Sequence, residues 1–469
     1  MLSNIIPAIN LQILVCYPSF MDRLADKALA AISPIPDFEV HGKVTKILGL
    51  LVEISGFGED ISIGSMIHLR PKPGIDIPCE VIGFRDARAL LMPFGTLDGI
   101  GLGCPAVIQR TQAQVCPDDR WLGRVIDGLG RPIDGKGPLT QGGRPIPLKN
   151  KPPLPHSRQR MGGKLDLGVR AVNTFLSTCS GQRMGIFSGS GVGKSVLLSM
   201  MARYTEADVS VIGLVGERGR EVQEFLEDDL GPEGLARSVV IVATGDEPAL
   251  MRRQAAYMTL SVAEYFRGEG KKVLCLIDSV TRFAMAQREI GLSAGEPPTS
   301  KGYPPTTFGE LARLLERAGP GAQGEGNITG LFSVLVEGDD TNEPISDAVR
   351  GIVDGHIVME RAIAERGRFP AINVLKSISR AMPKCLSAEQ NALIIKAKRL
   401  ISRYEDMAEL IRLGAYRKGS DQEVDEAIAR YPRLEAFLGQ NKEDSATIEQ
   451  SFALLGDVLG VPYKGGGKA

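Results

Sequence analysis

The sequence predicts a multi-domain α/β protein with a small N-terminal β-barrel, a central α/β core and a C-terminal helical domain. Three observations lead to this prediction. Short β-branched runs separated by turns fill residues 38–107, near-continuous apolar runs alternate with helical stretches over residues 165–384, and helical periodicity dominates from Ser387 onward. We place the predicted domains at residues 1–107, 108–384 and 385–469 of the 469-residue chain.

The first domain is predicted from segments rich in Val and Ile that are bounded by Gly, Pro and Asp. These segments read VHGKVTKILGLLVEISG, GSMIHLRP, PCEVIGFRDARALLMPF and GCPAVIQ. Several strands at close spacing, with no helical period, favour a small barrel or sandwich. A Gly/Pro/Asp-rich connection at Gly123–Lys151 then leads into the second domain.

The second domain contains five apolar runs of strand length, which read RMGIFSG, VSVIGLVG, SVVIVATG, KKVLCLID and GLFSVLVEG. Such runs are typical of parallel strands that are buried on both faces of a sheet. Beyond Ser387, SAEQNALIIKAKRLISRYEDMAELIRLGAY and QEVDEAIARYPRLEAFLGQ are predicted to be amphipathic helices, and the tail KGGGKA is predicted to be disordered.

The N-terminal segment Met1–Phe20 carries no charged side chain and is interrupted by Pro7 and Pro18. It lacks the basic region of a secretory signal and the unbroken length of a membrane span. It is therefore either a disordered leader or an over-extended start upstream of an initiating Met21. Apolar residues at helical spacing then predict a short amphipathic helix over Met21–Ile32, which either packs on the protein or touches a partner or membrane surface.

Composition limits the possible functions. The net charge of −1 gives no general attraction to nucleic acid, and none is expected as a partner. Seven cysteines are scattered without a CxxC pair, and four histidines lie far apart. This usage indicates a reducing cytoplasm and no zinc site.

A phosphate-binding loop is predicted where the strand MGIFSG runs into SGSGVGKS and then into the helical run VLLSMMARY. Its glycines let backbone N–H groups surround phosphate oxygens, Lys194 supplies a charge between the β- and γ-phosphates, and Ser195 offers a hydroxyl to Mg²⁺. The first glycine of the usual pattern is Ser188 here. The predicted ATP-binding residues are Ser188, Gly189, Ser190, Gly191, Val192, Gly193, Lys194, Ser195 and Val196.

Two carboxylates follow other apolar strands of the same core. Asp278 ends KVLCLID, where a carboxylate lies beside the phosphate loop and holds the Mg²⁺ water shell; a helix cap is the alternative. Glu217 follows VSVIGLVG and is predicted to orient the attacking water, with a loop ion pair to Arg218 or Arg220 as the alternative.

Seven motifs carry a family resemblance that covers almost the whole chain from about residue 38. They are GSGVGKS, GERGREV, IDSVTRFA, GEPPTSKGYPP, LVEGDDTNEPISD, GHIVMERAIAERGRFPAI and SISR. As a set they resemble the rotary, RecA-like hexameric ATPases, in particular the flagellar type III export ATPases of the secretion branch, which are related to the beta subunit of ATP synthase. The resemblance implies a RecA-like P-loop core.

The resemblance also implies roles for single residues. Glu217 matches the catalytic glutamate, Arg218 the arginine beside it, and Arg380 in SISR an arginine finger that reaches the neighbouring subunit's nucleotide. Phe369 matches an aromatic residue that stacks on adenine. The segment Gly291–Thr307 matches a loop that faces the central pore.

The function implied is that of an ATP-hydrolysing motor for protein export, which acts as a homo-hexameric ring with Mg²⁺. Implied partners are a stator-like regulatory subunit at the N-terminus, a central-stalk-like coiled-coil protein, export chaperones with their cargo, and a membrane protein of the export gate. The implied location is the cytoplasm, peripherally at the inner face of the membrane. The alternatives are a needle-complex secretion ATPase, a rotary ATP synthase subunit and an RNA translocase. An RNA translocase would require a basic barrel with clustered aromatic residues, and residues 38–107 show no obvious stacking cluster.

Overall fold

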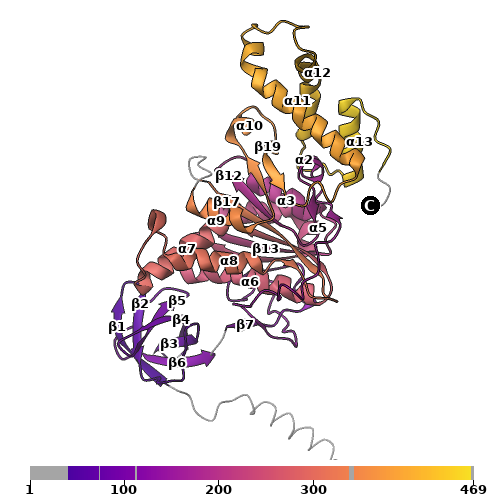
Figure 1. Cartoon of the computed structure of the whole chain (residues 1–469). Coiled ribbons are helices and arrows are strands. Elements are labelled where there is room, and N and C mark those ends of the chain that lie inside the picture. Colours follow the sequence, from indigo (N-terminus) through magenta and orange to yellow (C-terminus); the bar gives the residue numbers. More distant parts are fainter. Residues whose placement is uncertain (1–40, 73, 111–112, 337–342, 466–469) are drawn as a thin grey trace, which may run out of the picture.

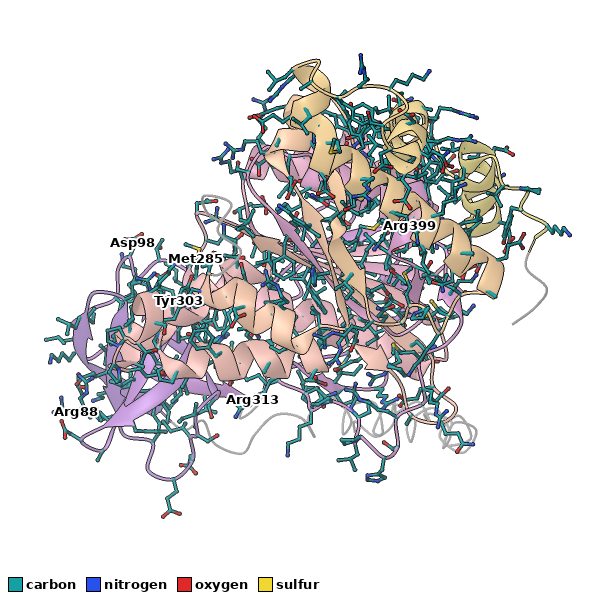
Figure 2. All side chains as sticks on the ribbon, turned by 45° about the horizontal axis from the view of Figure 1, so that its top comes forward. Arg88, Asp98, Met285, Tyr303, Arg313 and Arg399 are labelled. Carbon is teal, nitrogen blue, oxygen red and sulfur yellow. The ribbon has the colours of Figure 1, made fainter. Side chains whose placement is uncertain are left out.

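The computed structural model describes residues 41–72, 74–110, 113–336 and 343–465. The described part is elongated, with the barrel and the C-terminal helices at opposite ends of a central α/β core (Figure 1). Figure 2 shows the same arrangement, with Arg88 on the barrel and Arg399 on the helical end. This order confirms the fold class predicted from the sequence.

The N-terminal strands form a closed barrel in the order β1-β2-β5-β4-β3-β6, which β1 closes by pairing with β6. Its strands are β1 (His41–Leu48), β2 (Leu51–Ser55), β3 (Met66–Lys72), β4 (Ile75–Arg85), β5 (Arg88–Pro93) and β6 (Pro105–Arg110). Alternate residues point inward, so that Val52 and Ile54 of β2 are fully buried. The predicted domain boundary at residue 107 falls inside β6, because the polar residues Gln109 and Arg110 continue the strand.

The core is built on a nine-stranded sheet with the order β19-β18-β12-β17-β15-β13-β14-β8, and β16 pairs with β17. The five predicted apolar runs form β12, β13, β14, β15 and β17, which pair in parallel. The core strands are β8 (Arg124–Asp127), β12 (Arg183–Ser188), β13 (Val209–Glu217), β14 (Ser238–Thr244), β15 (Lys272–Asp278), β16 (Gly319–Pro320), β17 (Asn327–Leu335), β18 (Gly355–Met359) and β19 (Ile372–Ser379).

The segment Gly123–Lys151, predicted as a connection, contributes β8 to the sheet edge. Four residues are too few to stand out from the surrounding Gly and Pro. Short two-stranded sheets flank the core: β7 (Gln114–Val115) with β9 (Ile146–Pro147), and β10 (Lys164–Leu165) with β11 (Thr178–Cys179).

Both faces of the sheet are covered, because alternate residues of one strand enter different hydrophobic clusters. Val211 and Val215 of β13 pack with α6, α7 and α8, whereas Ile212 and Leu214 pack with α2, α3 and the C-terminal helices. The core helices are α2 (Arg170–Phe175), α3 (Lys194–Tyr204), α4 (Gly219–Glu224), α5 (Gly231–Ala236), α6 (Ala249–Gly268), α7 (Val280–Ala294), α8 (Pro305–Glu316), α9 (Pro344–Ile352) and α10 (Arg361–Glu365).

The C-terminal domain consists of α11 (Ala388–Arg412), α12 (Gln422–Leu438) and α13 (Ile448–Leu459). Ser387 and Gln390 cap α11 reciprocally, which explains why the helix begins where the apolar period does. The segment Gly291–Thr307 is not wholly a loop, since its ends belong to α7 and α8. The predicted Met1–Phe20 leader, the Met21–Ile32 helix and the end of the C-terminal tail lie outside the described residues. Within the described residues, no helix has both the length and the apolar character that a membrane span requires.

A buried ion pair ties the barrel to the core. Glu80 of β4 contacts the guanidinium of Arg253 on α6, and each side chain is only 4% exposed. Lys149 Nζ lies 2.9 Å from the other Glu80 oxygen. Burial alone would raise the pKa of Glu80, but Arg253 and Lys149 outweigh it and hold that pKa below its ordinary value. The barrel is therefore anchored by charge as well as by packing.

Glu80→Ala should destabilise the protein by about 3–5 kcal/mol, because it leaves the buried Arg253 cation without its partner. The measurement is chemical unfolding, with Glu53→Ala as the control, since Glu53 pairs with exposed cations on the same barrel. Equal midpoints for the two variants would contradict this account.

Candidate nucleotide site

The loop Ser188–Ser195 connects β12 to α3, and its glycines are required by the backbone. Gly191 and Gly193 have φ of 77° and 83°, a region that L-residues other than glycine rarely adopt. Gly193 also precedes α3 directly, so the positive end of that helix faces the loop. The loop borders a cavity of about 540 Å³ that Glu217, Arg218, Arg282 and Arg361 also line. Backbone N–H groups and cations thus converge on one concave site.

Lys194 lies between the two predicted carboxylates. Its Nζ contacts Asp278 Oδ1 and lies 3.5 Å from Glu217 Oε1. Burial would lower the pKa of Lys194, but the charges of Asp278 and Glu217 outweigh that effect and raise it. The ammonium therefore stays charged, as a group that is to neutralise phosphate must.

The direction of Glu217 depends on a bulge in β13. The register of β13 against β14 shifts between Val215 and Glu217, and Gly216 between them has φ of 76°. A Cβ at Gly216 would approach Arg282 to 2.7 Å, so only glycine fits there. Bulges of this kind re-aim a side chain at the end of a strand.

Burial raises the pKa of Glu217 to about 7, with the Asp278 charge adding to the effect and Lys194 opposing it. A carboxylate with a pKa near neutrality can accept a proton from a water molecule or hold that water by a hydrogen bond. Glu217 lines the phosphate cavity, so a water molecule in that cavity can reach its carboxylate.

Two residues that the sequence analysis missed belong to this site. Ser333 of β17 is fully buried, and its hydroxyl donates to Asp278 Oδ1 at 2.5 Å. Arg361 reaches the loop from α10, with Nη2 at 3.4 Å from the carbonyl of Ser190. A polar residue near the end of an otherwise apolar strand was the only signal for Ser333, and no local pattern pointed to Arg361.

A second cavity, of about 700 Å³, shares Gly193 and Val196 with the phosphate cavity. Phe369 lines it, and its ring is close enough to the loop that a Cβ at Gly193 would lie 3.2 Å from Cδ1. Residues of the C-terminal domain, Glu435 and Ala436 among them, complete the wall. An aromatic face beside a phosphate loop suits a purine base.

Two further predicted residues, Arg218 and Arg380, are exposed. Arg218 lines the rim of the phosphate cavity, is 85% exposed, and lies 3.2 Å from Glu221. Arg380 is exposed at the end of β19, in the turn after Ser379.

Strand register places Arg380 at the edge of the sheet opposite the loop. Ser379 pairs with Gly355, which precedes the His356 that aligns with Gly185. Arg380 is thus near the start of β12, whereas the loop begins at Ser188. The Arg380 N–H donates to the Asp354 carbonyl and the Asp354 N–H to that of Arg183, so five residues of parallel strand, about 17 Å, separate the level of Arg380 from Ser188. The structure therefore brings Lys194, Glu217, Asp278 and Ser195 together but leaves Arg380 apart.

A glycine loop between a parallel strand and a helix, with carboxylates at the tips of neighbouring strands, defines a P-loop nucleotide-binding protein. The family model of the ATP synthase alpha/beta nucleotide-binding domain matches residues 168–379, and that of the T3SS EscN ATPase C-terminal domain matches residues 386–457.

Individual relatives agree with the two family models. The flagellum-specific ATP synthase of Caulobacter vibrioides is 57% identical over 440 residues, which cover 93% of this chain and 99% of the relative. The type 3 secretion system ATPase of Xanthomonas euvesicatoria is 44% identical, with 89% and 94% of the two chains covered. The solved structure of assembled EscN with its central stalk EscO, from enteropathogenic E. coli, superposes with a TM-score of 0.82 at 39% identity, covering 89% of this chain and 100% of that one.

The chain belongs to the ATP synthase alpha/beta family, in the branch of the flagellum-specific ATP synthases and type III secretion ATPases. It is an ATPase.

Proposed function

We propose that this ATPase drives protein export for the flagellum as a hexameric ring whose active sites lie between subunits. The observation that carries the shared site is the position of Arg380, exposed at the sheet edge opposite its own phosphate loop. This position supports a role for the guanidinium at another chain's nucleotide rather than at its own. The higher identity to a flagellar relative than to a secretion relative, 57% against 44%, favours the flagellar role over the needle-complex one.

Within one site, the loop residues Ser188–Val196 hold the phosphates of ATP through backbone N–H groups. On binding, Lys194 exchanges its carboxylate partners for the β- and γ-phosphates. Glu217, re-aimed by the bulge at Gly216, then holds the attacking water in line with the γ-phosphate. Arg218 stands at the rim beside it, and Arg380 of the adjacent chain offsets the charge that develops on the γ-phosphate.

Mg²⁺ fits the oxygen donors that the site offers. Magnesium takes one or two protein oxygens together with waters and substrate phosphates. The hydroxyl of Ser195 and the carboxylate of Asp278 would hold it, and the ion would neutralise charge between the β- and γ-oxygens. Ser333, by donating to Asp278, fixes the direction of that carboxylate.

The cavity around Phe369 connects nucleotide binding to the helical domain. Phe369 would stack on adenine, and the wall that Glu435 and Ala436 supply belongs to α12. A bound base would therefore contact both domains, so the helical domain can respond to the nucleotide. We propose that this response releases cargo from export chaperones and delivers it to the export-gate membrane protein.

The assembled relative supports the proposal of a central-stalk partner. EscN is solved with a central stalk, and we propose a coiled-coil stalk of the same kind for this chain. We further propose a stator-like regulatory subunit at the N-terminus and a peripheral position at the cytoplasmic face of the membrane.

The role of Glu217 tests the catalytic part of this proposal. Glu217→Gln keeps the shape of the side chain but cannot accept a proton, so ATP binding and assembly should persist while steady-state hydrolysis falls by about 10²-fold or more. Binding is measured with a fluorescent ATP analogue and assembly by light scattering.

Glu224→Gln is the matched control, because Glu224 lies on the neighbouring helix α4, is 48% exposed and pairs with Arg220 away from the residues that line the cavity. It should keep hydrolysis within about twofold of the native rate. If Glu217→Gln unfolded or lost ATP binding, the residue would be structural and its proposed role wrong.

A further inference from the structure

The turn that carries Arg380 is held by a set of buried contacts at the start of β12. The backbone N–H of Arg380 donates to the carbonyl of Asp354 at 2.9 Å. Gln182, fully buried, donates from Nε2 to the same carbonyl at 3.1 Å and to Ser379 Oγ at 3.0 Å. Ser379 Oγ donates in turn to the carbonyl of Ser177 at 2.8 Å. These contacts restrict the backbone from which the Arg380 side chain extends.

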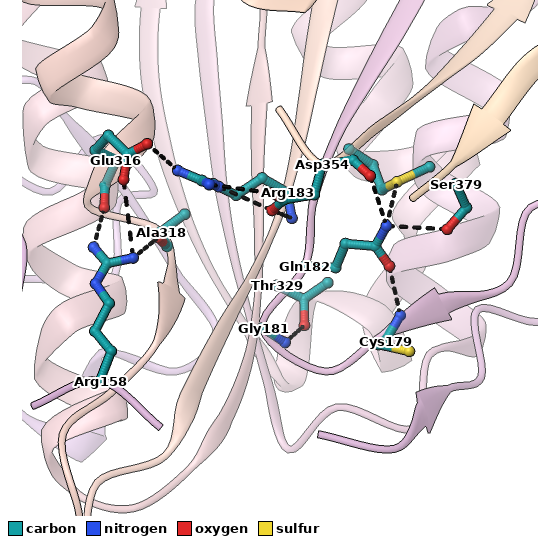
Figure 3. Close-up of polar contacts among 11 residues, drawn as sticks. Arg158, Cys179, Gly181, Gln182, Arg183, Glu316, Ala318, Thr329, Asp354 and Ser379 are labelled. Atoms are coloured by element: carbon teal, nitrogen blue, oxygen red, sulfur yellow. Dashed lines mark hydrogen bonds and ion pairs between the residues drawn. The ribbon is translucent and has the colours of Figure 1, made fainter. Parts of the chain in front are cut away.

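Asp354 is fixed by the first residue of β12 (Figure 3). Arg183 Nε lies 3.0 Å from Asp354 Oδ2, and Nη2 lies 3.1 Å from Oδ1, a two-point contact. The backbone N–H of Arg183 donates to Oδ2 as well, at 3.1 Å. The side chains are 14% and 25% exposed, so water screens the pair only in part. Two-point arginine–carboxylate contacts fix direction as well as distance.

The same arginine reaches α8. Arg183 Nη1 lies 2.5 Å from Glu316 Oε1 at the end of that helix, and Arg158 donates to the Glu316 carbonyl (Figure 3). Arg183 therefore joins three elements: the strand that leads into the chain's own phosphate loop, the helix α8 and the turn that presents Arg380.

We propose that the Arg183–Asp354 pair is a positioning element for the arginine finger, by which the strand of each chain's own P-loop sets the finger offered to the next chain. This inference rests on the proposed ring with shared sites. A shift of β12 on nucleotide binding would move Arg183, then Asp354, then the turn of Arg380. The pair would thus transmit the state of one site to the adjacent site.

The test is Asp354→Asn in the assembled enzyme. The amide keeps the size of the side chain and the backbone bond to Arg380, but loses the charge that orients Arg183. Displacing a group that acts at the transition state lowers turnover rather than substrate binding, so kcat should fall about tenfold with KM for ATP within about twofold.

Two further variants separate positioning from folding. Arg183→Lys keeps the charge but loses the two-point contact, and should lower kcat in the same direction. Glu289→Gln is the matched control, because it breaks an ion pair to Arg252, which at 14% exposed is as buried as Arg183. It should leave kcat within about twofold. Equal losses of kcat in Glu289→Gln and Asp354→Asn would overturn the inference.

Mixed rings show in which chain the defect acts. Asp354→Asn is mixed with an equal amount of Glu217→Gln, and single-turnover hydrolysis is measured once subunit exchange is confirmed. One interface in about four then joins an intact Glu217 to an intact finger turn. With a tenfold defect, activity should rise to about five times the mean of the separate samples if the defect lies in the finger.

Activity that stays at that mean would place the defect in the variant's own site and overturn the inference. A parallel mixture of Arg380→Ala with Glu217→Gln keeps the two proposals apart. Recovery in that mixture but not in the first overturns only the positioning role of Asp354. With exchange confirmed, recovery in neither overturns the shared site and the inference together.

Discussion

Arg380→Ala is expected to reduce ATP hydrolysis by about 10³–10⁵-fold, the usual contribution of an arginine finger. No local feature of the chain gives Arg380 another role of that size. Among the described residues it makes no side-chain ion pair within its own chain, and the turn holds its backbone about 17 Å of strand away from the level of its own loop. Steady-state hydrolysis by the purified ring is the measurement, with melting temperature as the check on folding.

Mixing distinguishes a finger that acts on the neighbour from one that acts on its own chain. In rings of Arg380→Ala and Glu217→Gln in equal parts, about one interface in four has both groups intact, so activity should return although each variant alone is dead. Confirmed exchange without single-turnover recovery would reject the shared site. Single-turnover conditions are required, because a ring whose sites must hydrolyse ATP in sequence would show no steady-state activity if any one of its sites were defective.

Lys194→Ala is expected to reduce nucleotide binding or turnover by at least about 10²-fold, since a preorganised charge stabilises the transition state by several kcal/mol. The loss has a second cause here. Lys194 contacts Asp278 and lies 3.5 Å from Glu217, so its removal leaves two carboxylates in one buried site without their cation. The pKa of Glu217, already raised, should rise further. ATP titration and hydrolysis are measured side by side.

The control for Lys194→Ala is Lys396→Ala, which removes a lysine that pairs with Glu426 on the helical domain, far from the loop. That variant should hydrolyse ATP at the native rate. Near-normal turnover in Lys194→Ala would contradict the phosphate-binding role of the loop.

Much of the fold and part of the candidate site could be predicted because local signals carried them. Apolar runs of strand length identified the parallel sheet, and carboxylates at the tips of two such runs identified Asp278 and Glu217, since strand tips meet at one edge. What could not be predicted depends on contacts between distant segments. Ser333 reaches Asp278 only because β17 lies beside β15 in the sheet. Arg361 reaches the loop only because α10 lies next to it. The bulge at Gly216 is a matter of register, which no single strand reveals.

The roles predicted for Arg380 and Phe369 came from the family resemblance and not from local sequence signals. Neither residue has a neighbour in sequence that marks it, and the structure explains why. Phe369 lines a cavity shared with α12, and Arg380 leaves a turn whose backbone contacts involve Gln182 and Asp354, which are far from it in sequence.

The Glu80–Arg253 pair limits how freely the barrel can be exchanged during evolution or design. A barrel grafted from a relative that lacks a carboxylate at the position of Glu80 would bury the Arg253 cation unpaired. The junction is therefore compatible only with donors that bring the acid, or with grafts in which α6 receives an apolar residue at the same time. The barrel and α6, although separate along the chain, must therefore change together at these two positions.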